Sequence, residues 1–96
     1  MDKLFIERIA KQLASDYLDC LDHPKQLNTL STPSKIIVLY NSGDEETMQF
    51  KKFMTEYFDE RNRSIKILSE NEIDPTQNHN YRINVRNCLE NPPRLY

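Results

Sequence analysis

The chain has 96 residues, of which 38% are hydrophobic and 29% charged, and its formal net charge at pH 7 is -2. This length predicts a single domain with a small core, and the content of Ile, Leu, Phe and Tyr excludes a wholly disordered chain. The slightly acidic balance gives no general attraction to nucleic acid or to anionic lipid, so binding to either would need a local basic patch.

The two cysteines and the N-terminus indicate where the protein works. Cys20 and Cys88 are too few for a disulfide scaffold and lack the paired spacing of a zinc site, so we expect both to be reduced and partly buried. No apolar run is long enough to span a membrane. The N-terminus lacks the basic region followed by an apolar block that is typical of a secretory signal. We therefore expect a cytoplasmic, soluble protein without a membrane partner.

The first element is an amphipathic helix over residues 2–21. Apolar residues, Phe5 among them, recur there at spacings of three and four, while polar residues fill the opposite arc. Pro24 should end the helix, because proline disfavours helical geometry in the residue before it. The polar residues 25–34 are then expected to be a connector.

A strand and a second helix follow. Residues 36–40, "IIVLY", form a continuous apolar run that is typical of a central strand covered on both faces. Ser42 and Glu45 have the spacing of a capping box, and Gly43 is expected to make a tight turn into the helix. An apolar stripe that includes Phe58 predicts that this helix runs from Asp44 to Arg61.

The rest of the chain should complete a small sheet. Residues 64–68 predict an edge strand joined to the central strand by a parallel βαβ crossover, and residues 69–80 predict a loop. The alternating residues 81–86 predict a last strand of unspecified direction, with Arg82 and Arg86 on its exposed face. The two prolines near the C-terminus predict an extended tail.

These elements predict the fold class α/β: a small three-stranded, mostly parallel sheet with a βαβ unit and an N-terminal amphipathic helix packed on it. We expect residues 1–90 to form this single domain and residues 91–96 to be an extended C-terminal tail. The N-terminal helix should cover one face of the sheet and the helix over residues 44–61 the other face.

The acidic turn around Gly43 lies where open α/β sheets bind ligands. One glycine followed by three carboxylates, Asp44 first, suits the helix dipole and repels a phosphate, so a phosphate site is not expected. A small metal-dependent enzyme at the Asp44 loop, with Glu70 as the second acid, is one alternative. No nucleophile or histidine has a catalytic motif around it, so we predict a chain that is not an enzyme and has no cofactor.

The predicted function is that of a non-catalytic accessory or adaptor subunit. Two long amphipathic helices offer more apolar surface than a three-stranded sheet can cover, so another protein subunit, or a second copy of the chain, should bind the remainder. The alternative partner is nucleic acid, bound through Arg82 and Arg86. The residues expected to contact a partner are Phe5, Phe58, Leu68, Arg82, Arg86, Leu95 and Tyr96.

The order of the elements also has a counterpart among known proteins. Over residues 33–87, the succession of strand, helix, strand, polar loop and short arginine-bearing strand resembles the psi accessory subunits of the bacterial clamp loader. The resemblance lies in this pattern and implies a replication accessory subunit. The tryptophan associated with that family's closing segment is absent, since the chain contains none, so no functional residue is carried over.

Overall fold

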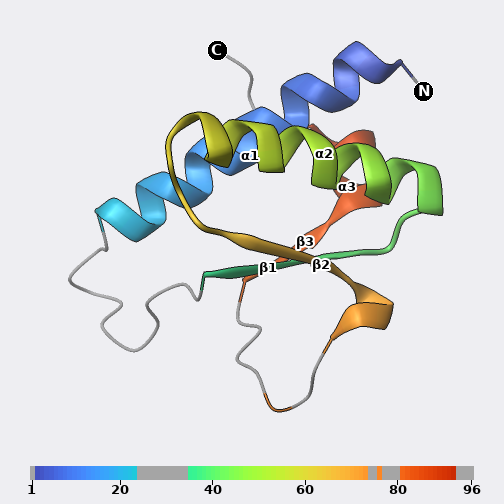
Figure 1. The fold of residues 1–96 in the computed structure, drawn as a ribbon. Helices are drawn as coiled ribbons and strands as arrows, with labels where there is room; N and C mark the ends of the chain where they lie inside the picture. The colour runs from blue at the N-terminus through green and yellow to red at the C-terminus, as the bar shows by residue number, and fades with distance from the viewer. Residues whose placement is uncertain (1, 24–34, 74–75, 77–80, 93–96) are drawn as a thin grey trace.

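The computed structural model describes residues 2–23, 35–73, 76 and 81–92 (Figure 1). Helices and strands alternate in this part of the chain. In order they are α1 (Lys3–Asp22), β1 (Ile36–Tyr40), α2 (Asp44–Glu60), β2 (Lys66–Ser69), the short 3₁₀ helix η2 (Glu70–Glu72), β3 (Tyr81–Asn84) and α3 (Val85–Glu90). The predicted α/β class, with an N-terminal helix packed on a three-stranded sheet, is confirmed.

The sheet is parallel throughout, with the strand order β2-β1-β3. The apolar run of β1 is therefore central, as predicted, and β2 is at an edge. Ile37 and Leu39 face the helices and are at most 1% exposed, while Val38 points to the other face and is also buried. The direction of β3, which the sequence left open, is parallel to β1.

Both long helices lie on the same face of the sheet, which corrects the prediction of one helix on each face (Figure 1). A single buried cluster contains Ile9 and Tyr17 of α1, Phe50 and Phe58 of α2, and the helix-facing residues of β1. The apolar stripe of a helix shows that one side is buried but not which element buries it. Because α1 and α2 cover each other as well as the sheet, three short strands suffice for two long helices.

The end of the described chain also differs from the prediction. The last strand stops at Asn84, and α3 (Val85–Glu90) replaces its expected final residues, 85 and 86. Asn84 caps α3, since its side-chain oxygen accepts a 3.0 Å hydrogen bond from the backbone N–H of Asn87. Val85 and Leu89 are buried, one helical turn apart. Val85 fits a strand alternation and a helix stripe equally well, which explains the error.

Three smaller predictions concern surface and termini. Cys88 is half-buried as expected, whereas Cys20 is exposed, and both thiols are free. The connector over residues 25–34 falls wholly outside the described residues, as do residues 93–96 of the tail. In the part of the chain that the structure describes, no helix is long and apolar enough to cross a membrane.

Candidate functional site

The turn between β1 and α2 is built differently from the predicted capping box. Gly43 is the N-cap of α2, with no side-chain cap, and its φ of -74° is open to any residue. The residue in the left-handed region is Asn41, with φ 59°. Ser42 bonds through its hydroxyl to the hydroxyl of Thr47, which donates a 2.9 Å hydrogen bond to the carbonyl of Gly43. The tight turn therefore depends on Asn41 rather than on the glycine.

Asn41 ties the carboxyl end of β1 to that of β3. Its Nδ2 atom donates a 3.1 Å hydrogen bond to Oδ1 of Asn84, the cap of α3. Its carbonyl accepts a second 3.1 Å hydrogen bond from the backbone N–H of Arg86. Because the turns after these two strands are bonded to each other, the carboxyl edge of the sheet is held together on the β3 side.

On the β2 side, the chain leaves the two neighbouring strands in opposite directions. After β1 it passes to α2 above the sheet, and after β2 it passes to η2 on the side away from the helices (Figure 1). Diverging connections at the carboxyl ends of adjacent parallel strands leave a crevice between them, and this is the usual ligand-binding position in open α/β sheets.

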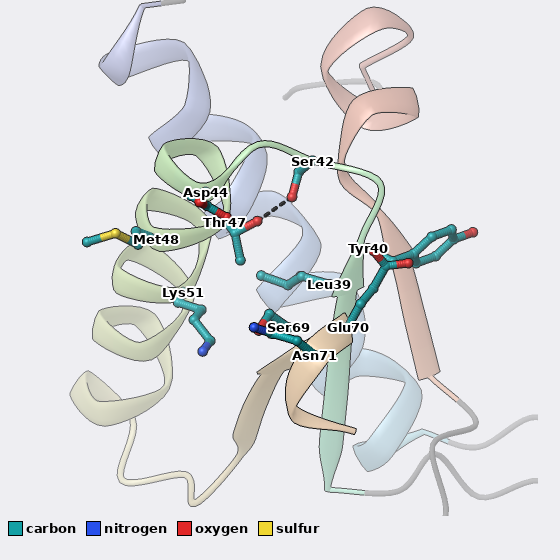
Figure 2. Close-up of a pocket in the computed structure, with 10 residues that line it drawn as sticks. All are labelled: Leu39, Tyr40, Ser42, Asp44, Thr47, Met48, Lys51, Ser69, Glu70 and Asn71. Atoms are coloured by element: carbon teal, nitrogen blue, oxygen red, sulfur yellow. Dashed lines mark hydrogen bonds between the residues drawn. The ribbon is translucent and has the colours of Figure 1, made fainter. Parts of the chain in front are cut away.

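A pocket of about 530 Å³ occupies that position (Figure 2). Figure 2 shows side chains from the β1–α2 turn and α2 on one side, side chains from β2 and η2 on the other, and Leu39 between them. The lining residues are Leu39, Tyr40, Ser42, Asp44, Thr47, Met48, Lys51, Ser69, Glu70 and Asn71.

Most hydrogen-bonding groups around the pocket are already paired with one another. Lys51 makes an ion pair with Glu72, which joins α2 to η2. The same Glu72 carboxylate accepts hydrogen bonds from the backbone N–H (3.0 Å) and the hydroxyl (2.6 Å) of Ser69. The bonds from Lys51 and Ser69 stabilise the charged form, so the pKa of Glu72 falls from its ordinary value of 4.5 to about 2.

Two carboxylates and one apolar side chain of the pocket have no such partner. Asp44, at the first position of α2, and Glu70, at the first position of η2, make no side-chain hydrogen bond or ion pair with the described residues. Met48, one turn into α2, is 69% exposed. The pocket thus combines apolar surface with two unpaired negative charges, and Asp44 and Glu70, the pair named from the sequence, both line it.

Several residues predicted to contact a partner belong to the core instead. Phe58 is 1% exposed, and its ring packs edge-on against the ring of Tyr17, with 5.9 Å between the ring centres. Leu68 is 5% exposed. Neither offers accessible surface to a partner. Phe5 is partly buried against the same core, while its neighbour Leu4 is 62% exposed. Leu95 and Tyr96 lie outside the described residues.

The two arginines of the predicted basic face do not share a strand. Arg82 belongs to β3, and its guanidinium lies 5.3 Å from the centre of the Tyr40 ring. Arg86 belongs to α3, where the alternation of the strand no longer applies. Both side chains are exposed, but the strand register that would align them on one face is absent.

The pocket itself was only partly visible in the sequence. No motif in the sequence marks Met48, Ser69 or Asn71. The available signal was positional: the residues that follow two adjacent parallel strands meet at one edge of the sheet. Within the described residues, no group of three or more His, Cys, Asp or Glu side chains could hold a metal ion.

Comparison of the chain with protein-family models, with curated proteins and with solved structures finds no match. The resemblance to the psi subunits of the clamp loader therefore stays a prediction, and the function must be argued from the pocket.

Proposed function

We propose that this chain is a non-catalytic accessory subunit of the cytoplasm, and that it binds another protein at the pocket between the ends of β1 and β2. The observation that carries this proposal is the exposure of Met48 at a pocket whose serine and threonine hydroxyl groups are paired internally. Such a site presents contact surface rather than an activated nucleophile.

The hydroxyl groups of the pocket lack a suitable base. The only carboxylate bonded to a pocket hydroxyl among the described residues is that of Glu72, on Ser69. Its pKa of about 2 makes it a weak proton acceptor near neutral pH, where a general base works best with a pKa close to the ambient pH. Ser42 and Thr47 bond to each other and to a backbone carbonyl. None of these hydroxyls is therefore activated for nucleophilic attack.

Exposed Met48 favours a protein partner. A methionine side chain is unbranched and polarizable, so it adapts to a partner's shape, and methionine is enriched in protein interfaces. Among the other apolar lining residues, Tyr40 is half-buried, whereas Leu39 is 1% exposed and adds almost no accessible surface. Exposed apolar surface bordered by charged groups has the composition of a protein-binding site.

The test is affinity purification of the tagged chain from its native, nuclease-treated lysate, with mass spectrometry of the retained proteins. We expect a stoichiometric partner with the wild-type chain and its loss with Met48→Gln. The matched control is Thr55→Gln, because Thr55 is exposed on the same face of α2 two turns beyond Met48. A chain that is recovered alone, or a partner equally retained by both variants, would overturn the proposal.

A further inference from the structure

We propose that the outer edge of β3 binds an extended segment of another protein as an added antiparallel strand, with an acidic residue of that segment opposite Arg82. This edge lies on the other side of β1 from the pocket, so the inference goes beyond the proposed function and does not rest on it. It depends on the backbone groups at the two edges of the sheet, on the charge beside β3 and on the side chains next to that charge.

The outer edge of β3 carries unpaired backbone groups. In a parallel sheet the N–H and C=O of one residue point to the same side of the strand, and successive residues alternate. The first bond between β1 and β2 runs from the N–H of Lys66 to the carbonyl of Lys35, so Val38 faces β3 instead. Val38 is opposite Arg82 in the register and therefore bonds to the two residues that flank Arg82. The N–H and C=O of Arg82 point away from the sheet and have no hydrogen-bond partner among the described residues.

The outer edge of β2 is capped by comparison. The N–H of Ser69 points outwards there and donates a 3.0 Å hydrogen bond to the carboxylate of Glu72. Lys51 holds the same carboxylate through an ion pair. A strand added beside β2 would have to break these bonds. No described side chain bonds to the backbone at the outer edge of β3, so an added strand displaces nothing of the described chain there.

Arg82 sets the charge of the partner. Its side chain is exposed and makes no ion pair with the described residues, and its guanidinium lies 5.3 Å from the centre of the Tyr40 ring. Directly opposite residues of two antiparallel strands have their Cβ atoms about 5 Å apart on the same face, where opposite charges attract and like charges repel. A symmetric pairing of two copies centred on Arg82 would bring two arginines together. An acidic residue of another protein forms a favourable pair instead.

The residues that flank the acid in the bound segment should be apolar. Side chains of a strand alternate between the two faces, so these neighbours point to the face that the helices cover, beside Tyr81 and Ile83. Tyr81 is half-buried, with 4.6 Å between the centres of its ring and that of Tyr17, and the rest of its side chain is accessible. Aromatic and β-branched side chains form favourable cross-strand pairs. A valine–glutamate–valine segment combines both contacts.

The experiment titrates the ¹⁵N-labelled full chain with the peptide acetyl-Thr-Val-Glu-Val-Thr-amide and follows the backbone amides by NMR. We expect saturable shifts at residues 81–84. Hydrogen exchange of the Arg82 N–H should slow on binding, because this group is bonded only in the complex. Exchange of the Ile83 N–H should change little, because it already bonds to β1.

Two matched peptides separate the charge from the backbone pairing. The peptide with glutamine in place of glutamate should bind about two- to fivefold more weakly, the loss expected for one exposed ion pair. The peptide with N-methylated glutamate keeps the charge but lacks the central backbone donor, and it should show no saturable binding.

Variants of the protein locate the contact. Arg82→Gln should bind the glutamate peptide no more tightly than the wild-type chain binds the glutamine peptide. The matched control is Arg8→Gln, which removes an exposed arginine from α1 and should leave binding unchanged. Met48→Gln, at the pocket, should also leave it unchanged.

Several results would overturn the inference: no saturable shifts, shifts confined to other residues, or equal binding of the glutamate peptide and either matched peptide. Protection of the Arg82 N–H that rises with the concentration of the chain alone would assign the edge to a second copy. Loss of peptide binding in Met48→Gln but not in Arg82→Gln would place the peptide at the pocket, which would support the proposed function and overturn this inference.

Discussion

The two ends of the parallel sheet differ in how their charged side chains are paired. At the end where the strands begin, Arg63 makes two hydrogen bonds of 2.9 and 3.0 Å to the carboxylate of Asp22, joining the turn after α2 to the end of α1 (Figure 1). At the end where the strands stop, Asp44 and Glu70 have no hydrogen-bond or ion-pair partner among the described residues, and Met48 is exposed.

This difference separates residues that hold the fold from residues that are free to bind. At the end where the strands begin, hereafter the paired end, the aromatic rings of Tyr17, Phe58 and Tyr81 pack together. Tyr17 and Phe58 are almost completely buried. At the other end, the diverging connections of β1 and β2 prevent such closure, and they leave a pocket. Mutations at the two ends should therefore affect different properties.

The largest expected effect is on the stability of the paired end. Phe58→Ala removes a buried aromatic ring and should cost about 3–5 kcal/mol, a large share of the roughly 5–15 kcal/mol typical of a domain. Met48→Ala, at the pocket, should change stability by no more than about 0.5 kcal/mol. Urea denaturation followed by circular dichroism measures both.

A milder variant keeps the Phe58 prediction testable if Phe58→Ala fails to fold. Phe58→Leu retains most of the apolar volume and should fold with a smaller loss of stability. A Phe58 variant that is as stable as Met48→Ala would show that Phe58 is not part of the core, and it would return this residue to the set of partner contacts.

An intermediate effect is expected from acid at the pocket end. Because the pKa of Glu72 is lowered in the folded state, its bonds to Lys51 and Ser69 stabilise the fold fully above pH 4.5. This contribution should be lost as the pH falls from 4.5 towards 2, where Glu72 becomes protonated. Urea denaturation at a series of pH values should show wild type more stable than Glu72→Gln near neutral pH, and the difference should shrink from pH 4.5 downwards and vanish only below pH 2.

The matched control is Glu70→Gln, which removes an unpaired carboxylate from the same turn and should not reproduce this pH dependence. At the paired end, the bond from Arg63 lowers the pKa of Asp22 below its ordinary value of 3.8. The ion pair between Asp22 and Arg63 therefore also stabilises the folded state at higher pH, and this stabilisation should be lost as the pH falls below 3.8. A difference between wild type and Glu72→Gln that stayed constant with pH would contradict the assignment of the Glu72 bonds.

The smallest effect concerns the start of α2. Gly43 occupies the N-cap with an extended backbone, and a Cβ atom built there would meet nothing within 4 Å. Gly43→Ser supplies a side-chain acceptor for the first free N–H groups of the helix and should raise stability by a few tenths of a kcal/mol. A lower midpoint of thermal unfolding would mean that the turn needs its glycine, as the sequence suggested.

Much of the fold could be predicted because it depends on local periodicity. The stripe of α1, the stripe of α2 and the uninterrupted apolar run of β1 are long enough to identify each element and to place β1 at the centre of the sheet. The segment from Val85 to Glu90 is short, and its pattern is compatible with either structure. Its helix is decided by the cap at Asn84 and by the burial of Leu89, both of which depend on tertiary contacts.

The candidate site was predictable in position but not in composition. The sequence alone determined an α/β domain whose acidic Asp44 follows a central strand. It could not determine that both helices share one face, that Phe58 and Leu68 are core residues, or that Glu72 pairs with Lys51. Those features depend on which surfaces meet in space, and residues distant in the chain carry no local signal of their contact. The tertiary structure alone therefore decided which charges are paired and which remain free at the pocket.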